Sequence, residues 1–197
     1  MKTKQYVTIF ISFTAILFNP FSARGEEQSQ NAALKQEAVS IVKKFAGTLK
    51  PLLKGAIQSG GLSHAINSCS NEAPRIAKQL SRETGWTIKR VSLRPRNMKN
   101  ATADSFERKV LDQFNEQQIK GELSETIVYY ETIGNQFRFM KAQGVDGICL
   151  NCHGKTLSAD VVSALKKHYP GDIAVGYSKG ELRGAFSLIK NLKITKK

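Results

Sequence analysis

Two cysteines and a histidine stand close together in the last quarter of this 197-residue chain, in the order Cys149-Leu150-Asn151-Cys152-His153. The Cys-x-x-Cys-His spacing is typical of c-type haem attachment, in which the two thiols bond to the haem vinyl groups and the histidine ligates the iron. The sequence therefore predicts one covalently bound haem c, with Cys149, Cys152 and His153 as its attachment and proximal-ligand residues.

The same pair of cysteines fits two other kinds of site, which the rest of the sequence disfavours. A thioredoxin-like dithiol lies near the start of its fold, between a strand and a helix, whereas this pair follows the glycine-rich residues 144–147. A tetrahedral zinc site needs a second close pair of ligands. The remaining candidates do not form such a pair: Cys69, His64 and His168.

The N-terminus has the pattern of a secretory signal. Lys2 and Lys4 precede an uncharged, mostly apolar run at residues 6–18, and about 13 residues fit a signal peptide better than a membrane span. We predict removal of residues 1–25, a periplasmic location and a single mature haem domain over residues 26–197. The alternative is an uncleaved N-terminal anchor.

The net positive charge of the chain indicates what kind of partner it binds. The chain has 30 Lys and Arg against 16 Asp and Glu, and its formal charge of +14 falls to +11 if Lys2, Lys4 and Arg24 leave with the signal. A basic exported protein attracts an acidic partner protein or an anionic membrane surface, and we expect no nucleic acid there. The remaining length of about 170 residues suffices for one domain with its own core.

Apolar periodicity and turn residues predict the elements that must position the motif, in an α+β order of N-terminal helices followed by an antiparallel sheet. We expect a helix break near Pro74, which would set Cys69 close to a joint between helices. In the last strand, strict alternation predicts that Leu182 and Phe186 share one face and that Ala185 lies on the other. The predicted helices are 26–57, 62–84, 105–120 and 158–169, and the predicted strands are 86–93, 126–133, 136–142 and 181–192.

Four stretches together resemble a family of sensor-associated, PAS-like extracytoplasmic haem c domains. The order of the stretches and the Arg-Gly-Ala at residues 183–185 make the resemblance specific. The chain departs from the usual family pattern at Met98, where members often have proline, and at Phe106, where they often have tryptophan. The resembling stretches are residues 65–77, 90–97, 149–153 and 176–187.

The resemblance implies a PAS-like antiparallel sheet, with His153 as the proximal ligand and Cys69 as the opposite axial ligand of the iron. A physical argument agrees, because a cysteine without a partner in an oxidising compartment is a hazard that iron ligation removes. Thiolate ligation also stabilises ferric iron. The alternatives at this position are an open or water-occupied site and three side chains, His64, His168 and Met98.

Four arginines are candidates for pairing with the haem propionates, because a guanidinium group matches a carboxylate in shape and charge. Arg183 is favoured because it lies in the resembling Arg-Gly-Ala stretch. The other three candidates are Arg90, Arg94 and Arg96.

The predicted function is an extracytoplasmic monohaem cytochrome domain that acts in redox or small-ligand sensing. Exchange of the weak axial ligand on reduction would admit NO or CO, and an unidentified partner protein would carry the signal. The alternative is a periplasmic electron-transfer cytochrome c that keeps both ligands and docks to an acidic redox partner. No distal acid/base group stands out in the sequence, so we expect no enzyme activity.

Overall fold

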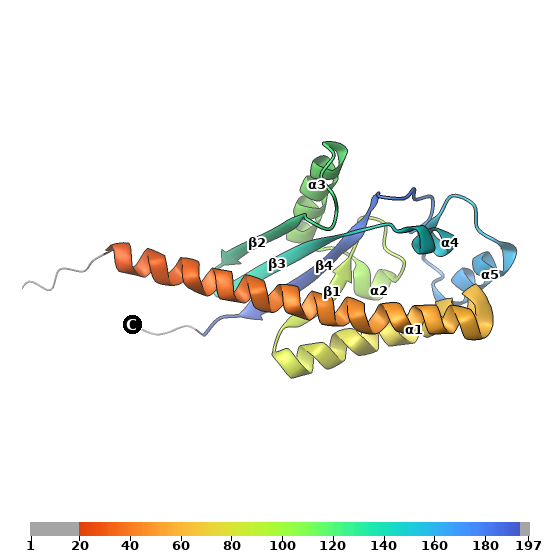
Figure 1. Cartoon of the computed structure of the whole chain (residues 1–197), viewed down its shortest axis with the longest axis horizontal. Helices are drawn as coiled ribbons and strands as arrows, with labels where there is room; N and C mark the ends of the chain where they lie inside the picture. Colours follow the sequence, from red (N-terminus) through yellow and green to blue (C-terminus); the bar gives the residue numbers. More distant parts are fainter. Residues whose placement is uncertain (1–19, 194–197) are drawn as a thin grey trace, which may run out of the picture.

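The computed structural model describes residues 20–193, which form a long helix, a four-stranded sheet and several shorter helices (Figure 1). The predicted signal segment at residues 6–18 lies outside the described residues. The predicted cleavage point after Gly25 falls within α1, the helix Pro20–Thr84. In the part of the chain that the structure describes, no helix has the length and apolar character needed to cross a membrane.

The long helix α1 consists of two helices that meet at Gly61. This residue has φ 74° and ψ −169°, a conformation that glycine adopts readily, and the second helix folds back along the first (Figure 1). The helix continues through Pro74, so the predicted break there is wrong, and Cys69 lies inside a continuous helix. Burial of Ala73 and Ile76 on either side of the proline offsets the one backbone hydrogen bond that proline removes.

The sheet is antiparallel throughout, with the strand order β1-β4-β3-β2. Gly134, with φ 59°, begins the two-residue turn of the β2–β3 hairpin, as the sequence predicts. Long helices followed by an antiparallel sheet confirm the predicted α+β class. The strands are β1 (Thr87–Val91), β2 (Val128–Ile133), β3 (Gln136–Gly144) and β4 (Leu182–Asn191).

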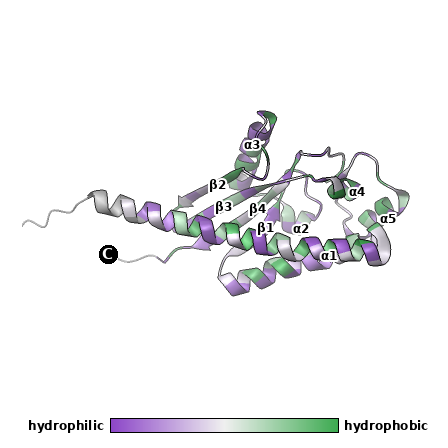
Figure 2. Ribbon diagram, viewed as in Figure 1, coloured by the Kyte–Doolittle hydropathy of each residue, from purple (hydrophilic) through white to green (hydrophobic). Residues whose placement is uncertain are grey.

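Helices cover both faces of the sheet, and each face has its own apolar core. Helix α1 covers one face, where Phe45 packs edge-on against Phe186 with ring centroids 5.3 Å apart and Trp86 packs against Phe137 at 6.0 Å. Figure 2 shows hydrophobic residues recurring along α1 between hydrophilic ones, as expected for a helix with one buried side. Helix α3 (Ser105–Ile119) covers the other face, where Val110, Leu111, Phe114 and Met140 are buried.

Helix α3 begins with a capping box that also buries a carboxylate. Asp104 Oδ1 accepts the Glu107 N–H, and Glu107 Oε2 accepts the Asp104 N–H, both at 2.8 Å. The fully buried Glu107 also accepts from Ser187 Oγ at 2.6 Å and pairs with Lys89 at 2.9 Å and Arg138 at 3.6 Å. Because a buried carboxylate is costly unless it is paired and hydrogen-bonded, this network fixes α3 to the sheet.

The start of β4 departs from strict alternation. The register of β3 against it shifts at this level, and Gly184 has φ 154°. Leu182 therefore joins Ala185 in the core under α3, while Phe186 faces α1, so the prediction that Leu182 and Phe186 share a face is wrong. A Cβ at Gly184 would lie 2.3 Å from the Val91 carbonyl oxygen, which only glycine avoids.

Candidate haem site

The Cys-x-x-Cys-His motif lies beyond the end of β3, at the opposite end of the molecule from the described chain termini (Figure 1). It occupies a 3-10 turn, η1 (Gly147–Cys149), and a one-turn helix, α4 (Leu150–His153). Asp146 caps η1 through its side chain at 2.9 Å. Gly154 ends α4, and a Cβ there would come within 2.5 Å of the Leu150 carbonyl oxygen. The motif is thus bounded by an aspartate cap and a required glycine.

The loop that precedes β4 runs along the motif and is bonded to it through the backbone. The Tyr177 N–H donates to the His153 carbonyl oxygen, and the Gly176 N–H donates to the Gly154 carbonyl oxygen, both at 2.9 Å. Gly176 has φ 81°, which favours glycine at this turn. The position of the histidine is therefore set by a segment more than 20 residues further along the chain.

His153 is held in the orientation of a metal ligand. Its Nδ1–H donates to the Ala174 carbonyl oxygen at 2.7 Å, which leaves Nε2 with a free lone pair, and ligating histidines commonly make such a second bond. Burial, together with the positive charges of Arg183 and Arg96, lowers the pKa of His153 to about 2. The imidazole is therefore neutral at pH 7, the form that binds a metal ion.

An ion pair behind the motif, which the sequence patterns did not predict, fixes the Ala174 carbonyl. Arg96 Nη2 donates to the carbonyl oxygens of Cys152 and Ala174, and its Nε pairs with Asp172 at 3.0 Å. Asp172 in turn accepts the Ala174 N–H at 2.8 Å. Both side chains are largely buried, with exposed fractions of 12% and 7%. Arg96 therefore links the motif to the following loop. The signal available in the sequence was the acidic residue Asp172, directly after Pro170 and Gly171.

Cys69 lies on α1 with a half-buried thiol, and its charge contributes to the raised pKa of Cys152 in the motif. Burial raises the pKa of Cys69, while the charges of Arg90 and Arg96 oppose the rise. Burial also raises the pKa of Cys152 and brings that of Tyr169 to about 12, and Cys69 adds to both shifts. The structure thus brings the third cysteine into the neighbourhood of the second, although they lie in different elements.

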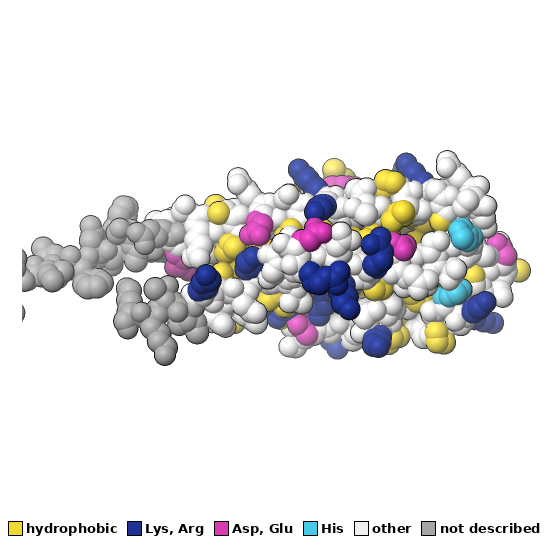
Figure 3. Space-filling model, turned by 90° about the horizontal axis from the view of Figure 1, so that it is seen from below, with side chains coloured by type: hydrophobic (Ala, Val, Ile, Leu, Met, Phe, Trp, Pro, Cys, Tyr) yellow, Lys and Arg dark blue, Asp and Glu magenta, His cyan; other side chains and the backbone are white. Residues whose placement is uncertain are grey.

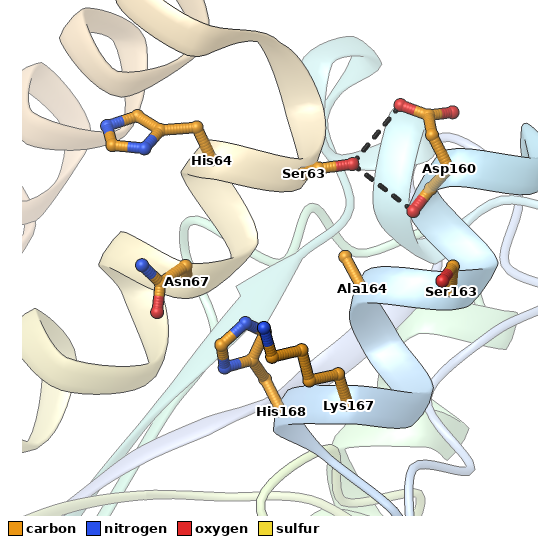
Figure 4. A pocket seen from close by; sticks show the side chains of 8 residues that line it. All are labelled: Ser63, His64, Asn67, Asp160, Ser163, Ala164, Lys167 and His168. Carbon is orange, nitrogen blue, oxygen red and sulfur yellow. Dashed lines mark hydrogen bonds between the residues drawn. The ribbon is translucent and has the colours of Figure 1, made fainter.

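His64 lies on the same helix as Cys69 but faces another direction. Successive residues of an α-helix turn by about 100°, so these two side chains lie about 140° apart around α1. His64 is exposed, and Figure 4 shows its ring pointing away from α5 (Ala159–His168). The structure therefore does not bring His64 toward the motif from the side on which Cys69 lies.

The other two candidate ligands also have surroundings of their own. His168 lines a groove of about 490 Å³ between α1 and α5, where it lies opposite Asn67 (Figure 4). Met98 begins the short helix α2 (Met98–Ala101) and is 47% exposed, against Gly171. Neither side chain is among the groups that shift the pKa of His153 or of Cys69.

The candidate propionate partners differ in how far the protein already uses their donors. The Arg90 guanidinium lies over the Phe45 ring, 5.6 Å from its centroid, and makes no hydrogen bond or ion pair with another described residue. Arg94 lies over the Tyr177 ring, 3.8 Å from its centroid. Arg183 donates from Nη1 to Ser92 Oγ at 2.9 Å, and its Nε lies 3.2 Å from the Nδ1 of the proximal histidine. Arg183 therefore sits on the side of the imidazole away from Nε2.

The donor set fits a c-type haem. Two thiols and a neutral imidazole lie on one short helical segment, and a third thiol approaches from α1. Within residues 20–193, no group of three or more His, Cys, Asp and Glu side chains is arranged to hold a bare metal ion. One imidazole and one thiol suit an iron whose four equatorial ligands come from a porphyrin.

Comparison with known proteins identifies both a family and a fold. The family model described as Tll0287-like matches residues 22–190. The crystal structure of the cyanobacterial haem protein Tll0287 is similar with a TM-score of 0.62 and 20% sequence identity, over 91% of this chain and 100% of that one. This likeness supports the α+β fold. No curated protein matches the chain.

Proposed function

The chain belongs to the Tll0287-like family, as the sequence resemblance indicates, and from this premise we propose that it is an exported monohaem c-type cytochrome domain. The observation that carries the proposal is a Cys-x-x-Cys-His motif whose histidine is neutral and fixed through Nδ1. The similar protein Tll0287 is itself described as a haem protein. Cys149 and Cys152 would form the thioether bonds, and His153 would bind the iron through Nε2.

In this proposal Cys69 would supply the second iron ligand, from α1. Its proximity to Cys152 supports the assignment, whereas His64 faces elsewhere on the helix. Arg90 and Arg96 favour the thiolate form of Cys69, so metal binding would replace the proton on its Sγ. A thiolate ligand favours the ferric state and lowers the reduction potential.

Arg183 and Arg90 would serve the haem in different ways. Arg183 lies at the Nδ1 side of His153, so it acts on the proximal ligand from behind and tunes the charge around the imidazole. Arg90 keeps its donors free of the other described residues and lies near Cys69. We therefore assign the propionate contact to Arg90 before Arg183, on the basis of its unused donors.

When bound, haem supplies one-electron redox chemistry and, where an axial ligand leaves, a position for NO or CO. The sensing role would depend on Cys69, whose Sγ can hold the iron as a thiolate or carry a proton as a free thiol. Burial raises the pKa of this thiol and so favours its protonated form. No catalytic acid/base role is proposed for any residue of the site.

Electron transfer is the second candidate function, and the surface charge favours it. Figure 3 shows Lys and Arg side chains gathered on the middle of one face, with a few Asp and Glu side chains between them. Such a face attracts an acidic redox partner and speeds the encounter. In this role Cys69 and His153 would both remain on the iron during the redox cycle.

Two measurements on the exported protein test the proposal. Haem that stays with the chain on a denaturing gel, but is lost from the Cys149→Ala/Cys152→Ala double variant, supports covalent attachment. Cys69→Ala is the matched control and should keep its haem. A wild-type chain that releases haem on denaturation contradicts the proposal.

Reduction under CO then separates the two roles. A sensor is expected to lose its thiolate ligand and form a CO adduct when reduced. A carrier is expected to stay six-coordinate and to exclude CO.

A further inference from the structure

A second cavity lies behind the proximal histidine. It has a volume of about 370 Å³, within the range of small-molecule sites. Its walls come from three places: the connection after β1, the C-terminal half of α3, and the segment leading into β4. The residues that matter here are Arg94, Asn115, Tyr177, Glu181 and Arg183 on the polar side and Leu93, Leu111 and Leu182 on the apolar side.

The polar wall carries hydrogen-bond donors that the described residues leave unused. Arg183 donates from Nη1 to Ser92 Oγ and to the Arg94 carbonyl oxygen, whereas Nη2 has no acceptor among the described residues. Arg94 uses only Nη1, which donates to the Val175 carbonyl oxygen. The Tyr177 hydroxyl likewise has no partner among the described residues, although its ring is buried between the two guanidinium groups.

The charge of the cavity is positive. Two guanidinium groups face one carboxylate, that of Glu181, which accepts the Ser178 N–H at 3.1 Å. Neither Arg94 nor Arg183 forms an ion pair with a described residue. Guanidinium groups with free donors bind carboxylates strongly and in a defined orientation.

The apolar wall indicates an organic ligand. Leu111 and Leu182 are buried beside the cavity, and Leu93 closes it at 38% exposure. An inorganic anion would leave the exposed part of Leu93 without a partner, whereas the carbon skeleton of a small acid would cover it. Asn115, whose amide makes no hydrogen bond within the described part of the chain, offers one more polar contact.

We propose that this cavity binds a small organic carboxylate, held between Arg94 and Arg183 with its carbon skeleton against Leu93. The site is separate from the haem position, because it lies at the Nδ1 side of His153 and the iron would lie at Nε2.

A carboxylate bound in the cavity would affect the haem through Arg183. An anion on this guanidinium adds negative charge next to the proximal imidazole and so favours ferric over ferrous iron. By linkage, the oxidised protein binds the carboxylate more tightly than the reduced protein. This second step rests on the proposed haem function, whereas binding itself does not.

Calorimetric titration of the haem-loaded full chain tests the binding step. The probes are benzoate and succinate, with benzamide, succinamide and inorganic phosphate as comparisons. We expect saturable binding of at least one carboxylate, weakened about tenfold or more in Arg94→Gln and in Asn115→Leu, since a charge-assisted bond contributes at least that much. Arg82→Gln removes an exposed charge elsewhere and should bind as the wild type does.

The proposal is overturned if neither carboxylate binds saturably, if the amides or phosphate bind as well as the carboxylates, or if Arg94→Gln binds like Arg82→Gln. A carboxylate that changes the axial ligation, seen as a new electron paramagnetic resonance (EPR) signal, also overturns it. If the ferric and ferrous proteins bind the carboxylate with equal affinity, the coupling between the cavity and the haem iron is refuted. Loss of haem from the chain during preparation would instead count against the proposed function, because the visible spectrum reports it separately.

Discussion

Large side chains such as Phe137, Phe139 and Leu188 are fully buried in the sheet, whereas the motif end, residues 144–181, is held mainly by polar contacts. Its two apolar clusters are small. Its position depends on the side chains of Arg96 and Arg183 and on backbone bonds between loops. Burial of apolar side chains thus stabilises the sheet without a cofactor. The motif end depends on polar contacts instead, as expected of a region whose packing a bound haem would complete.

The largest effect is expected from the sheet. Phe137→Ala removes a fully buried ring that packs against Trp86 and should lower the free energy of unfolding by about 3–5 kcal/mol. Urea denaturation followed by circular dichroism measures this loss of unfolding free energy. Leu123→Ala, at a side chain that is 67% exposed, is the control and should cost about 1 kcal/mol or less. If Phe137→Ala loosened only the motif end, the contrast between the two regions would be mistaken.

A smaller and local effect is expected from Arg96→Ala. The variant removes the ionic partner of the buried Asp172 carboxylate and one donor from each of two carbonyl oxygens, which costs about 2–3 kcal/mol. The loss should appear as faster hydrogen exchange of the Gly176 and Tyr177 amides, which bond to the motif. Amides of β3 and β4 should exchange as before. Equal acceleration in the sheet would show that the two regions unfold as one unit.

The smallest effect concerns pH in the haem-free chain. His153 has a folded pKa of about 2 against about 6.5 when unfolded, so the unfolded state takes up a proton that the folded state does not. Stability is then complete above pH 6.5 and falls as the pH decreases, by up to about 1.6 kcal/mol between pH 6.5 and 5. Unfolding curves at several pH values measure the slope, and His153→Gln should flatten it. An unchanged slope in that variant would contradict the burial of a neutral imidazole.

The elements of the sheet were predictable because each depends on nearby residues. The hairpin of strands 126–133 and 136–142 and the helix 105–120 follow from local sequence patterns, and the structure confirms both elements. The predictions were wrong where contacts between residues far apart in the sequence determine the structure. Pro74 stays inside α1 because its neighbours are buried against the core, and Leu182 changes face because of the irregular backbone at Gly184.

The candidate site was predictable to a similar extent. The Cys-x-x-Cys-His spacing is contiguous, so the sequence alone indicates the motif and its chemistry. The roles of Asp172 and of the Ala174 carbonyl depend on loops that meet only in the folded chain. The cavity beside Arg183 likewise joins three segments, and no spacing in the sequence indicates it.

We propose that His153 and Cys69 supply the two protein ligands of the haem iron. Low-temperature EPR of the exported ferric protein distinguishes this pair from the alternatives, with Cys69→Ala as the variant and His64→Ala as its control. We expect a low-spin rhombic thiolate signal that is lost in Cys69→Ala and kept in His64→Ala. A signal unchanged in Cys69→Ala would remove that cysteine from the iron and contradict the claim.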